Sequence, residues 1–448
     1  MAPESQTVLH TWSVPADWHA PTIAGGAGAW FWDTEGRRYL DMSSLSECCN
    51  LGHQHPAVVR AIQAQAATLC YTTSAWGAEP RARLAERLLE LSGFEGGRVY
   101  FTLGGADANE TAVKLARWAS DKPEGLVVTR ERSYHGASYA GIALSGDART
   151  EAQKPLAMRG VVQVPPPYAY RCPFGGRDER ESAALAAQAV DAAIVREGSA
   201  RVAAVMMETD AGTNGVVAPD GYWPALRELT RARGVYLIAD EVMSGFGRCG
   251  EWFAWQRHGA GARPDLMTLA KGLTGAHAPL GAVVLSAAIA ARLESKPIPT
   301  GLTYSGHPLC CAAGLAALGA YEDEKLIERS RHLGRAMRTR LDSMRERYDV
   351  VGDVRGGHGL FAVLELVRDR ATREPLSAWD AMHPELARLV AGARAEGVCF
   401  AARGNLILLA PPLVIEERDL ERALALLDRL LAELTLRRSE FAIQGATA

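Results

Sequence analysis

The sequence predicts an α/β protein with a mostly parallel central sheet, because three strand-like runs in the middle of the chain share one pattern. Each run is short and apolar and leads into a polar residue: Arg201–Met207 into Glu208, Gly234–Ala239 into Asp240, and Asp265–Ala270 into Lys271. The three polar residues lie roughly thirty residues apart, which is the size of a βαβ unit. Ligands of open α/β sheets bind at the carboxyl ends of the strands. We therefore expect Glu208, Asp240 and Lys271 to lie at one edge of the sheet.

The elements between these runs fit the same pattern. A helix is predicted from Asp220 to Gly234, with Asp220 as its N-cap and Gly234 just past its end. Another strand is predicted at Leu126–Thr129, and a glycine pair at Gly104 leads into a helix that extends to about Arg117.

The flanks of the chain predict a second, smaller α+β lobe that both termini form together. Short strands are expected near residues 29–32, 38–40, 359–366 and 406–409, with a long amphipathic helix after about Glu322 and a closing helix over 416–434. A chain of 448 residues exceeds what one hydrophobic core usually supports. We predict residues 1–67 as the N-terminal part of the small domain, 68–325 as the large domain, and 326–448 as the C-terminal part of the small domain.

Composition excludes several classes of protein. The formal net charge of −3 argues against nucleic acid or an anionic membrane as the main partner. No run of eighteen apolar residues is present, and residues 1–14 lack the basic-then-apolar pattern of a secretion signal. The eight cysteines are scattered and none forms a C-x-x-C pair, so neither a disulfide framework nor a metal site is expected. These features predict a cytoplasmic protein with reduced thiols.

The glycine pair Gly104–Gly105 is a candidate anion site. It leads directly into a helix, where backbone N–H groups are free at the positive end of the helix dipole. Gly105 and the amide of Ala106 are therefore candidate phosphate donors. The plain alternative is an ordinary strand-to-helix turn. The segment matches neither G-x-G-x-x-G nor the ATP-binding P-loop, which argues against a dinucleotide or ATP site.

Four further residues fit a flat heterocycle beside that anion site. Tyr134 follows a predicted strand and could stack on an aromatic ring, although such a tyrosine is more often part of a core or rim. Asp240 needs a cation if it is buried, and a protonated pyridine nitrogen is one such partner; the alternative is an acid that caps a loop. Val242 would cover the ring face opposite Tyr134. Lys271, between an apolar strand and a glycine, is expected to have the lowered pKa that imine chemistry needs.

Taken together, these residues resemble the class III aminotransferases, which are pyridoxal 5′-phosphate (PLP) enzymes of fold type I. The resemblance runs from about Trp30 to Pro412 and is specific as a set, although no single motif is. Its motifs are Asn50–Pro56, Gly104–Arg117, Tyr134–Gly136, Asp240–Val242, Gly245–Arg248, Ala270–Gly272 and Thr303–Pro308.

The resemblance implies a role for each matching residue. Lys271 corresponds to the lysine that holds PLP as a Schiff base, and Asp240 corresponds to the partner of the pyridine nitrogen. The other implied cofactor-binding residues are Gly105, Ala106, Tyr134, His135, Glu208, Val242 and Thr303. In the family, the threonine at the position of Thr303 reaches the phosphate bound by the neighbouring subunit, which implies a homodimer with its active sites at the interface.

Within the family, the sequence is most similar to taurine and other ω-amino acid aminotransferases, through Thr102–Glu110, Tyr170–Phe174 and Leu409–Leu413. The phosphate turn departs from the usual Ser-Gly-Ser-Glu and loses hydroxyl donors but keeps its backbone donors. The glutamate that masks the substrate arginine in some members is replaced by Thr213, so that gate is expected to be absent.

Three residues are candidates for substrate contact. Many ω-transaminases carry a mobile arginine at the position of Ala401; Arg403 faces the same way on a strand, and a structural salt bridge is the alternative for it. Glu47 replaces a usually neutral pocket residue and would favour a donor with a second cationic group, unless it points into solvent or pairs with an arginine. Trp76 either lines the pocket or simply packs.

The resemblance implies ping-pong transfer of an amino group from an ω-amino acid or amine donor to a keto acid, pyruvate or 2-oxoglutarate. Lys271 would move a proton between the substrate carbon and the cofactor. The alternatives are an aminomutase or racemase on the same fold, a non-catalytic PLP-binding protein, and, less favoured, a nicotinamide dehydrogenase.

Overall fold

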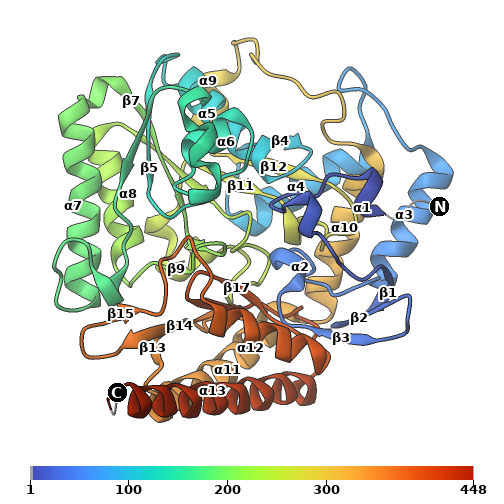
Figure 1. Cartoon of the computed structure of the whole chain (residues 1–448). Helices are drawn as coiled ribbons and strands as arrows, with labels where there is room; N and C mark the ends of the chain where they lie inside the picture. Colours follow the sequence, from blue (N-terminus) through green and yellow to red (C-terminus); the bar gives the residue numbers. More distant parts are fainter. Residues whose placement is uncertain (1–3, 447–448) are drawn as a thin grey trace.

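The large lobe is built around a seven-stranded sheet, seen in the upper part of Figure 1. The computed structural model describes residues 4–446. The strand order is β4 (Arg98–Thr102), β12 (Gly281–Leu285), β11 (Leu266–Leu269), β10 (Tyr236–Asp240), β7 (Val202–Glu208), β5 (Leu126–Arg130) and β6 (Val161–Val164). Strand β12 runs antiparallel to both of its neighbours, and the other paired strands are parallel. The predicted α/β class with a mostly parallel sheet is confirmed.

Helices cover both faces of this sheet, which explains why its central strands are mostly apolar along their length. All seven residues of β7 are buried. Met206 packs with helix α5 (Gly105–Ala119), while its neighbours Val205 and Met207 pack into the cluster that includes α7 (Glu179–Glu197) and α8 (Tyr222–Arg233). Successive side chains of a strand point to opposite faces, so the sheet separates two apolar layers.

The predicted strand ends do meet at one edge of the sheet. Asp240 pairs in register with Glu208 of β7 and with Thr268 of β11. Lys271 begins the 3₁₀ turn Lys271–Leu273, directly after β11 and Ala270.

Helix α8 differs from its prediction at one end. It begins at Tyr222, and its N-cap is Gly221 rather than Asp220. Gly221 has φ +90°, a conformation that favours glycine and turns the chain just before the helix. The other end is as predicted, because Gly234 caps the helix in the left-handed conformation.

A smaller sheet forms the base of the second lobe, with the strand order β13 (Val351–Gly356), β14 (Ala362–Asp369), β18 (Leu406–Leu409) and β17 (Ala401–Arg403); β15 (Glu374–Pro375) also pairs with β14. Helices α11 (Leu326–Arg347), α12 (Pro384–Ala395) and α13 (Glu417–Ala446) lie in this lobe, at the bottom of Figure 1.

The two ends of the chain are joined by a third sheet. Strands β1 (Ile23–Ala27), β2 (Trp30–Asp33) and β3 (Arg38–Asp41) are extended by β16 (Val398–Cys399), which runs parallel to β3. Helix α3 (Pro56–Thr68) instead packs on α10 (Pro308–Asp323), next to α4 (Glu79–Ser92). The domain borders at 67 and 325 stay predictions. Across residues 4–446, no helix is both long and apolar enough to cross a membrane.

Candidate active site

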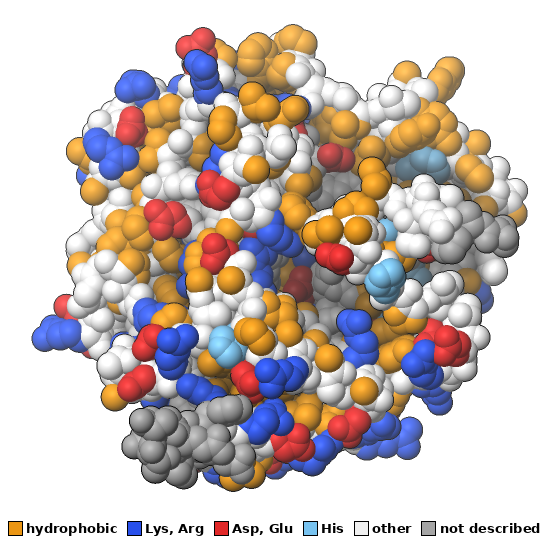
Figure 2. Space-filling view, in the orientation of Figure 1, with side chains coloured by type: hydrophobic (Ala, Val, Ile, Leu, Met, Phe, Trp, Pro, Cys, Tyr) orange, Lys and Arg blue, Asp and Glu red, His pale blue; other side chains and the backbone are white. Residues whose placement is uncertain are grey.

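A cavity of about 210 Å³ lies at the carboxyl edge of β7 and β10, next to the start of α5. Eight of the predicted residues line it: Gly105, Ala106, Tyr134, His135, Glu208, Asp240, Val242 and Lys271. Thr213, which stands where other members carry the masking glutamate, also lines it. Figure 2 shows this side of the molecule hollowed near its centre, where basic and acidic side chains meet.

The start of α5 offers free backbone donors to this cavity. Its N-cap, Gly104, is extended and makes no side-chain capping bond, so no side chain occupies the first N–H groups of the helix. A Cβ on Gly105 would lie 2.8 Å from Cγ1 of Val242, so glycine is needed for Val242 to approach this closely. This end of the cavity fits an anionic group such as a phosphate.

Asp240 is a buried carboxylate that hydrogen bonds position tightly. Its Oδ2 accepts from Nδ2 of Asn109 and faces Nδ1 of His135, each at 2.7 Å, and its Oδ1 accepts from the amide of Val242 at 3.0 Å. The residue is 3% exposed, and within residues 4–446 neither lysine nor arginine forms an ion pair with it. A buried carboxylate without a lysine or arginine partner is suited to accept a hydrogen bond from a cationic ring N–H that enters the cavity.

Asn109 also belongs to the candidate site, although it is not among the residues predicted from the sequence. Besides holding Asp240, its Nδ2 donates to the carbonyl of His135 at 3.1 Å, and its Oδ1 accepts from Oγ1 of Thr268 at 2.6 Å. One signal could have found it: it lies four residues after Gly105, on the same face of the predicted helix, and is polar where the neighbouring inward positions are apolar. Its amide connects α5, the Tyr134 loop, β10 and β11.

Glu208 fixes the loop that carries Tyr134. Its Oε1 accepts from the Tyr134 amide at 3.0 Å and from Nη2 of Arg130 at 3.1 Å. Burial raises the pKa of Glu208, and the Arg130 charge opposes that rise. The side chain of Glu208 therefore both lines the cavity and positions its aromatic wall.

The surroundings of Lys271 differ from what the sequence predicts in two respects: the partner of Glu47 and the direction of the Lys271 pKa shift. Nζ of Lys271 donates to Oε2 of Glu47 at 3.2 Å. Glu47 is only 6% exposed, so it does not point into solvent, and within residues 4–446 its ion-pair partner is Lys271 rather than an arginine. Burial lowers the pKa of Lys271, but the charge and hydrogen bond of Glu47, together with Cys48 and Asp240, oppose burial, and the net pKa is raised rather than lowered. The apolar neighbours of Lys271 along the chain predict a lowered pKa, whereas the carboxylate that opposes it lies 224 residues away in the sequence.

Arg403 lies in a salt bridge rather than in the cavity. Its Nη2 donates to Oδ1 of Asp147 at 2.7 Å, and Asp147 also binds Arg149. Burial raises the pKa of Asp147, but the hydrogen bonds from Arg149 and Arg403 lower it overall. The alternative expected for Arg403, a structural salt bridge, is the contact observed, and a role in substrate binding stays a prediction.

Two other predicted residues lie outside the cavity of a single chain. Trp76 is 72% exposed. Thr303 lies in a loop and is also exposed, and its backbone carbonyl accepts a hydrogen bond from the hydroxyl of Tyr71. Their contacts with substrate and with phosphate stay predictions.

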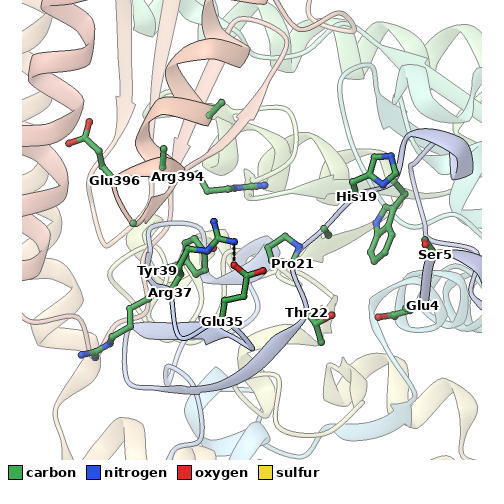
Figure 3. Close-up of a pocket in the computed structure, with 16 residues that line it drawn as sticks. Glu4, Ser5, His19, Pro21, Thr22, Glu35, Arg37, Tyr39, Arg394 and Glu396 are labelled. Carbon is green, nitrogen blue, oxygen red and sulfur yellow. Dashed lines mark hydrogen bonds and ion pairs between the residues drawn. The ribbon is translucent and has the colours of Figure 1, made fainter. Parts of the chain in front are cut away.

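A larger cavity of about 940 Å³ lies elsewhere, between the N-terminal segment, the turn before β3 and the end of α12 (Figure 3). Its labelled side chains spread apart rather than converge, and Arg37 pairs with Glu35. The smaller cavity, which contains Lys271 and Asp240, is therefore the candidate active site. No group of three or more histidine, cysteine or acidic side chains in residues 4–446 is arranged to hold a metal ion.

Comparison with known proteins agrees with the geometry. The family described as aminotransferase class-III matches residues 15–431. A taurine–pyruvate aminotransferase of Rhodobacter capsulatus is 34% identical, with 91% of each chain covered. A leucine/methionine racemase of Thermococcus litoralis is 36% identical, covering 93% of this chain and 92% of its own. The solved taurine:2-oxoglutarate aminotransferase of Bifidobacterium kashiwanohense, in complex with PLP and glutamate, is 35% identical, with 96% of each chain covered and a TM-score of 0.92.

Proposed function

The chain belongs to the class III aminotransferases, which are PLP-dependent, and on that premise we propose how its own residues perform amino transfer. The donor is an ω-amino acid or another amine, and the acceptor is a keto acid such as pyruvate or 2-oxoglutarate. The observation that carries this proposal is that the amine of Lys271, the carboxylate of Asp240 and the free N–H groups of α5 converge on one cavity.

Each residue present suits one part of the cofactor. When bound, PLP supplies an aldehyde carbon that receives the amino group and an aromatic ring that withdraws electrons. The α5 amides of Gly105 and Ala106 would hold its phosphate, and Asp240 would accept a hydrogen bond from the ring nitrogen. Tyr134 and Val242 would cover the two faces of the ring.

Lys271 has two tasks in this proposal. Its Nζ would hold the cofactor until the donor amine replaces it there. The same nitrogen, once free, would take the proton from the donor carbon as a positioned general base and would later donate it as a general acid. Asn109 and His135 hold Asp240 in place during these steps through the two 2.7 Å contacts.

Two of the residues proposed to bind substrate, Arg403 and Glu47, form ion pairs with other side chains in the structure. For Arg403 to hold the acceptor carboxylate, its guanidinium has to leave Asp147 and turn toward the cavity. Trp76 stays a candidate for the donor side, and Glu47 stays a candidate for a donor with a second cationic group.

A homodimer is part of the proposal, with Thr303 of each subunit at the phosphate bound by the other. The supporting observation is an exposed apolar surface beside Thr303, where Leu69, Trp76 and Tyr304 are 50%, 72% and 54% exposed. The rings of Tyr71 and Tyr304 are in contact, which joins the two loops into one surface that a second copy would cover. A cytoplasmic location fits the eight cysteines, all of which are free thiols.

An amine-donor panel tests the proposed function. Taurine, β-alanine, alanine, 1-phenylethylamine and putrescine are added singly to PLP-loaded protein, and the cofactor absorbance is followed. We expect at least one donor to change the absorbance and a keto acid to restore it with release of a new amino acid. Lys271→Ala should lose this cycle by at least about 10³-fold, and Lys114→Ala, which changes an exposed lysine, should keep it.

Two outcomes would contradict the proposal. If no amine alters the absorbance of the bound cofactor, the protein binds PLP without catalysing transfer. If one enantiomer of an amino acid is converted to the other with no keto acid present, the protein is a racemase, as its Thermococcus litoralis relative is named.

A further inference from the structure

Glu47, which is a candidate for binding a second cationic group of the donor, also contacts the reacting lysine. Its carboxylate is buried and lies 3.2 Å from Nζ of Lys271, the nitrogen that bonds to the cofactor. A Cβ at Gly212, which lines the cavity, would lie 3.4 Å from Cδ of Glu47. The carboxyl group of Glu47 thus lies next to two lining residues of the cavity, Gly212 and Lys271.

The backbone that presents Glu47 is held in an unfavourable conformation. All four residues of the turn α2 (Ser44–Glu47) are left-handed, with φ values of +48°, +43°, +72° and +56°. None of them is glycine, and such a conformation costs about 1–2 kcal/mol per residue. A conformation of this kind persists only where surrounding contacts impose it.

Buried polar contacts impose this conformation at the start of the turn. Nη2 of the fully buried Arg248 donates to Oγ of Ser44 at 2.9 Å and to Oδ1 of Asn50 at 2.8 Å. Oγ of Ser44 donates to the carbonyl of Ala410 at 2.6 Å. Oδ1 of Asp41 accepts from the Ser43 amide at 2.9 Å. The position of Glu47 is therefore fixed by contacts from both lobes.

Three ionisable groups lie close enough to Lys271 to change the charge of its amine. The groups that act on its nitrogen are Glu47, the thiol of Cys48 beside it, and Asp240 across the cavity. The same thiol and the guanidinium of Arg248 lie near Glu47. Of these three groups, Glu47 is the one that hydrogen-bonds Nζ, and it makes the largest contribution to raising the pKa of Lys271 against the effect of burial.

We propose that Glu47 holds the proton of free Lys271 and thereby sets the pH range in which Lys271 acts as nucleophile and base. The proposal rests on the role of Lys271 in the proposed function. An ammonium nitrogen has no lone pair, so Lys271 must lose one proton before it can attack a carbonyl or accept a proton from carbon. Glu47 stabilises the ammonium form and so lowers the neutral fraction at a given pH.

The direction of the expected effect follows from this charge. In Glu47→Gln the amide can still accept a hydrogen bond but carries no negative charge. The ammonium form of Lys271 then loses its counter-charge while burial remains, and burial disfavours a charged amine. Lys271 should become reactive at lower pH in this variant. In Glu47→Asp the charge is kept, so the behaviour of Lys271 should stay closer to that of the natural protein.

The test uses cofactor-free protein and measures the amine itself. Trinitrobenzenesulfonate reacts with neutral amines, and mass spectrometry of the digested protein reports the labelling rate of Lys271 at each pH. We expect Lys271 in Glu47→Gln to react on the order of tenfold faster at neutral pH than in the natural protein, as loss of a charge-assisted contact predicts. Glu131→Gln, which changes an exposed acid in the loop before Tyr134, should leave the rate unchanged. An identical pH dependence for Glu47→Gln and the natural protein would overturn the proposal.

A second measurement needs no variant and covers the case in which Glu47→Gln does not fold. In the natural protein, the exposed Lys114 serves as an internal reference in the same digest. The proposal predicts that Lys271 requires a higher pH than Lys114 for labelling, and a lower pH for Lys271 would contradict it. Neither measurement includes a donor or PLP, so their failure is distinct from failure of the donor panel.

Discussion

The cofactor end and the substrate end of the site are built in different ways. Asp240 and Glu208 lie on the last residues of adjacent parallel strands, and the α5 amides lie at a regular helix start. Glu47 lies on a left-handed turn near the N-terminus, and Arg403 lies on a short strand of the small lobe. In the proposed function, regular elements thus carry the groups that would hold the cofactor. Irregular or distant elements carry the candidates for substrate recognition.

The two ends should also respond differently to mutation. At the cofactor end, Asn109, His135, Asp240 and Thr268 already contact one another at 2.6–3.1 Å. These contacts hold the side chains in place. At the substrate end, Arg403 is bound to Asp147 and has to exchange partners before it can act. We expect large losses from changes at the first end and smaller, substrate-dependent losses at the second.

Replacement of Asp240 by asparagine should have the largest effect. The variant removes the negative charge that balances the cofactor ring nitrogen, and its amide would face Nδ1 of His135. We expect kcat/KM to fall on the order of 10²–10³-fold for every donor and acceptor. Asp323→Asn, at an exposed position, is the matched control. Full activity in Asp240→Asn would remove Asp240 from the chemistry.

Asn109→Ala should act mainly on stability. The change leaves buried groups of Asp240, His135 and Thr268 without their partner, and such a loss costs about 1–3 kcal/mol. The free energy of unfolding should fall by that amount in a denaturant titration, with Gln153→Ala as an exposed control. If Asn109→Ala unfolds like the natural protein, the connecting role of its amide is wrong.

Arg403→Ala should have the smallest effect, and that effect should depend on the substrate. We expect KM for pyruvate and 2-oxoglutarate to rise about tenfold, the loss of one charge-assisted contact, with little change for an amine donor that lacks a carboxylate. Arg394→Ala, an exposed arginine of α12, is the control. Unchanged kinetics for both keto acids would leave Arg403 as a purely structural partner of Asp147.

The same division decides how much the sequence could predict. Strand ends, the helix start and the C-cap at Gly234 are local sequence patterns. The sequence alone therefore predicts the positions of Glu208, Asp240, Gly105 and Lys271 in the fold. The Glu47–Lys271 contact joins residues 224 apart through a left-handed turn that no propensity indicates. Asn109 could have been found from its helical position, but its three partners come from separate elements.

One experiment tests the central claim, that Lys271 carries the cofactor, most directly. The PLP-loaded protein is reduced with borohydride, digested and analysed by mass spectrometry for the lysine that retains the cofactor. We predict that the label lies on Lys271 and is absent from Lys271→Ala. A label on another lysine, or none in a protein that still exchanges amino groups, would contradict the account.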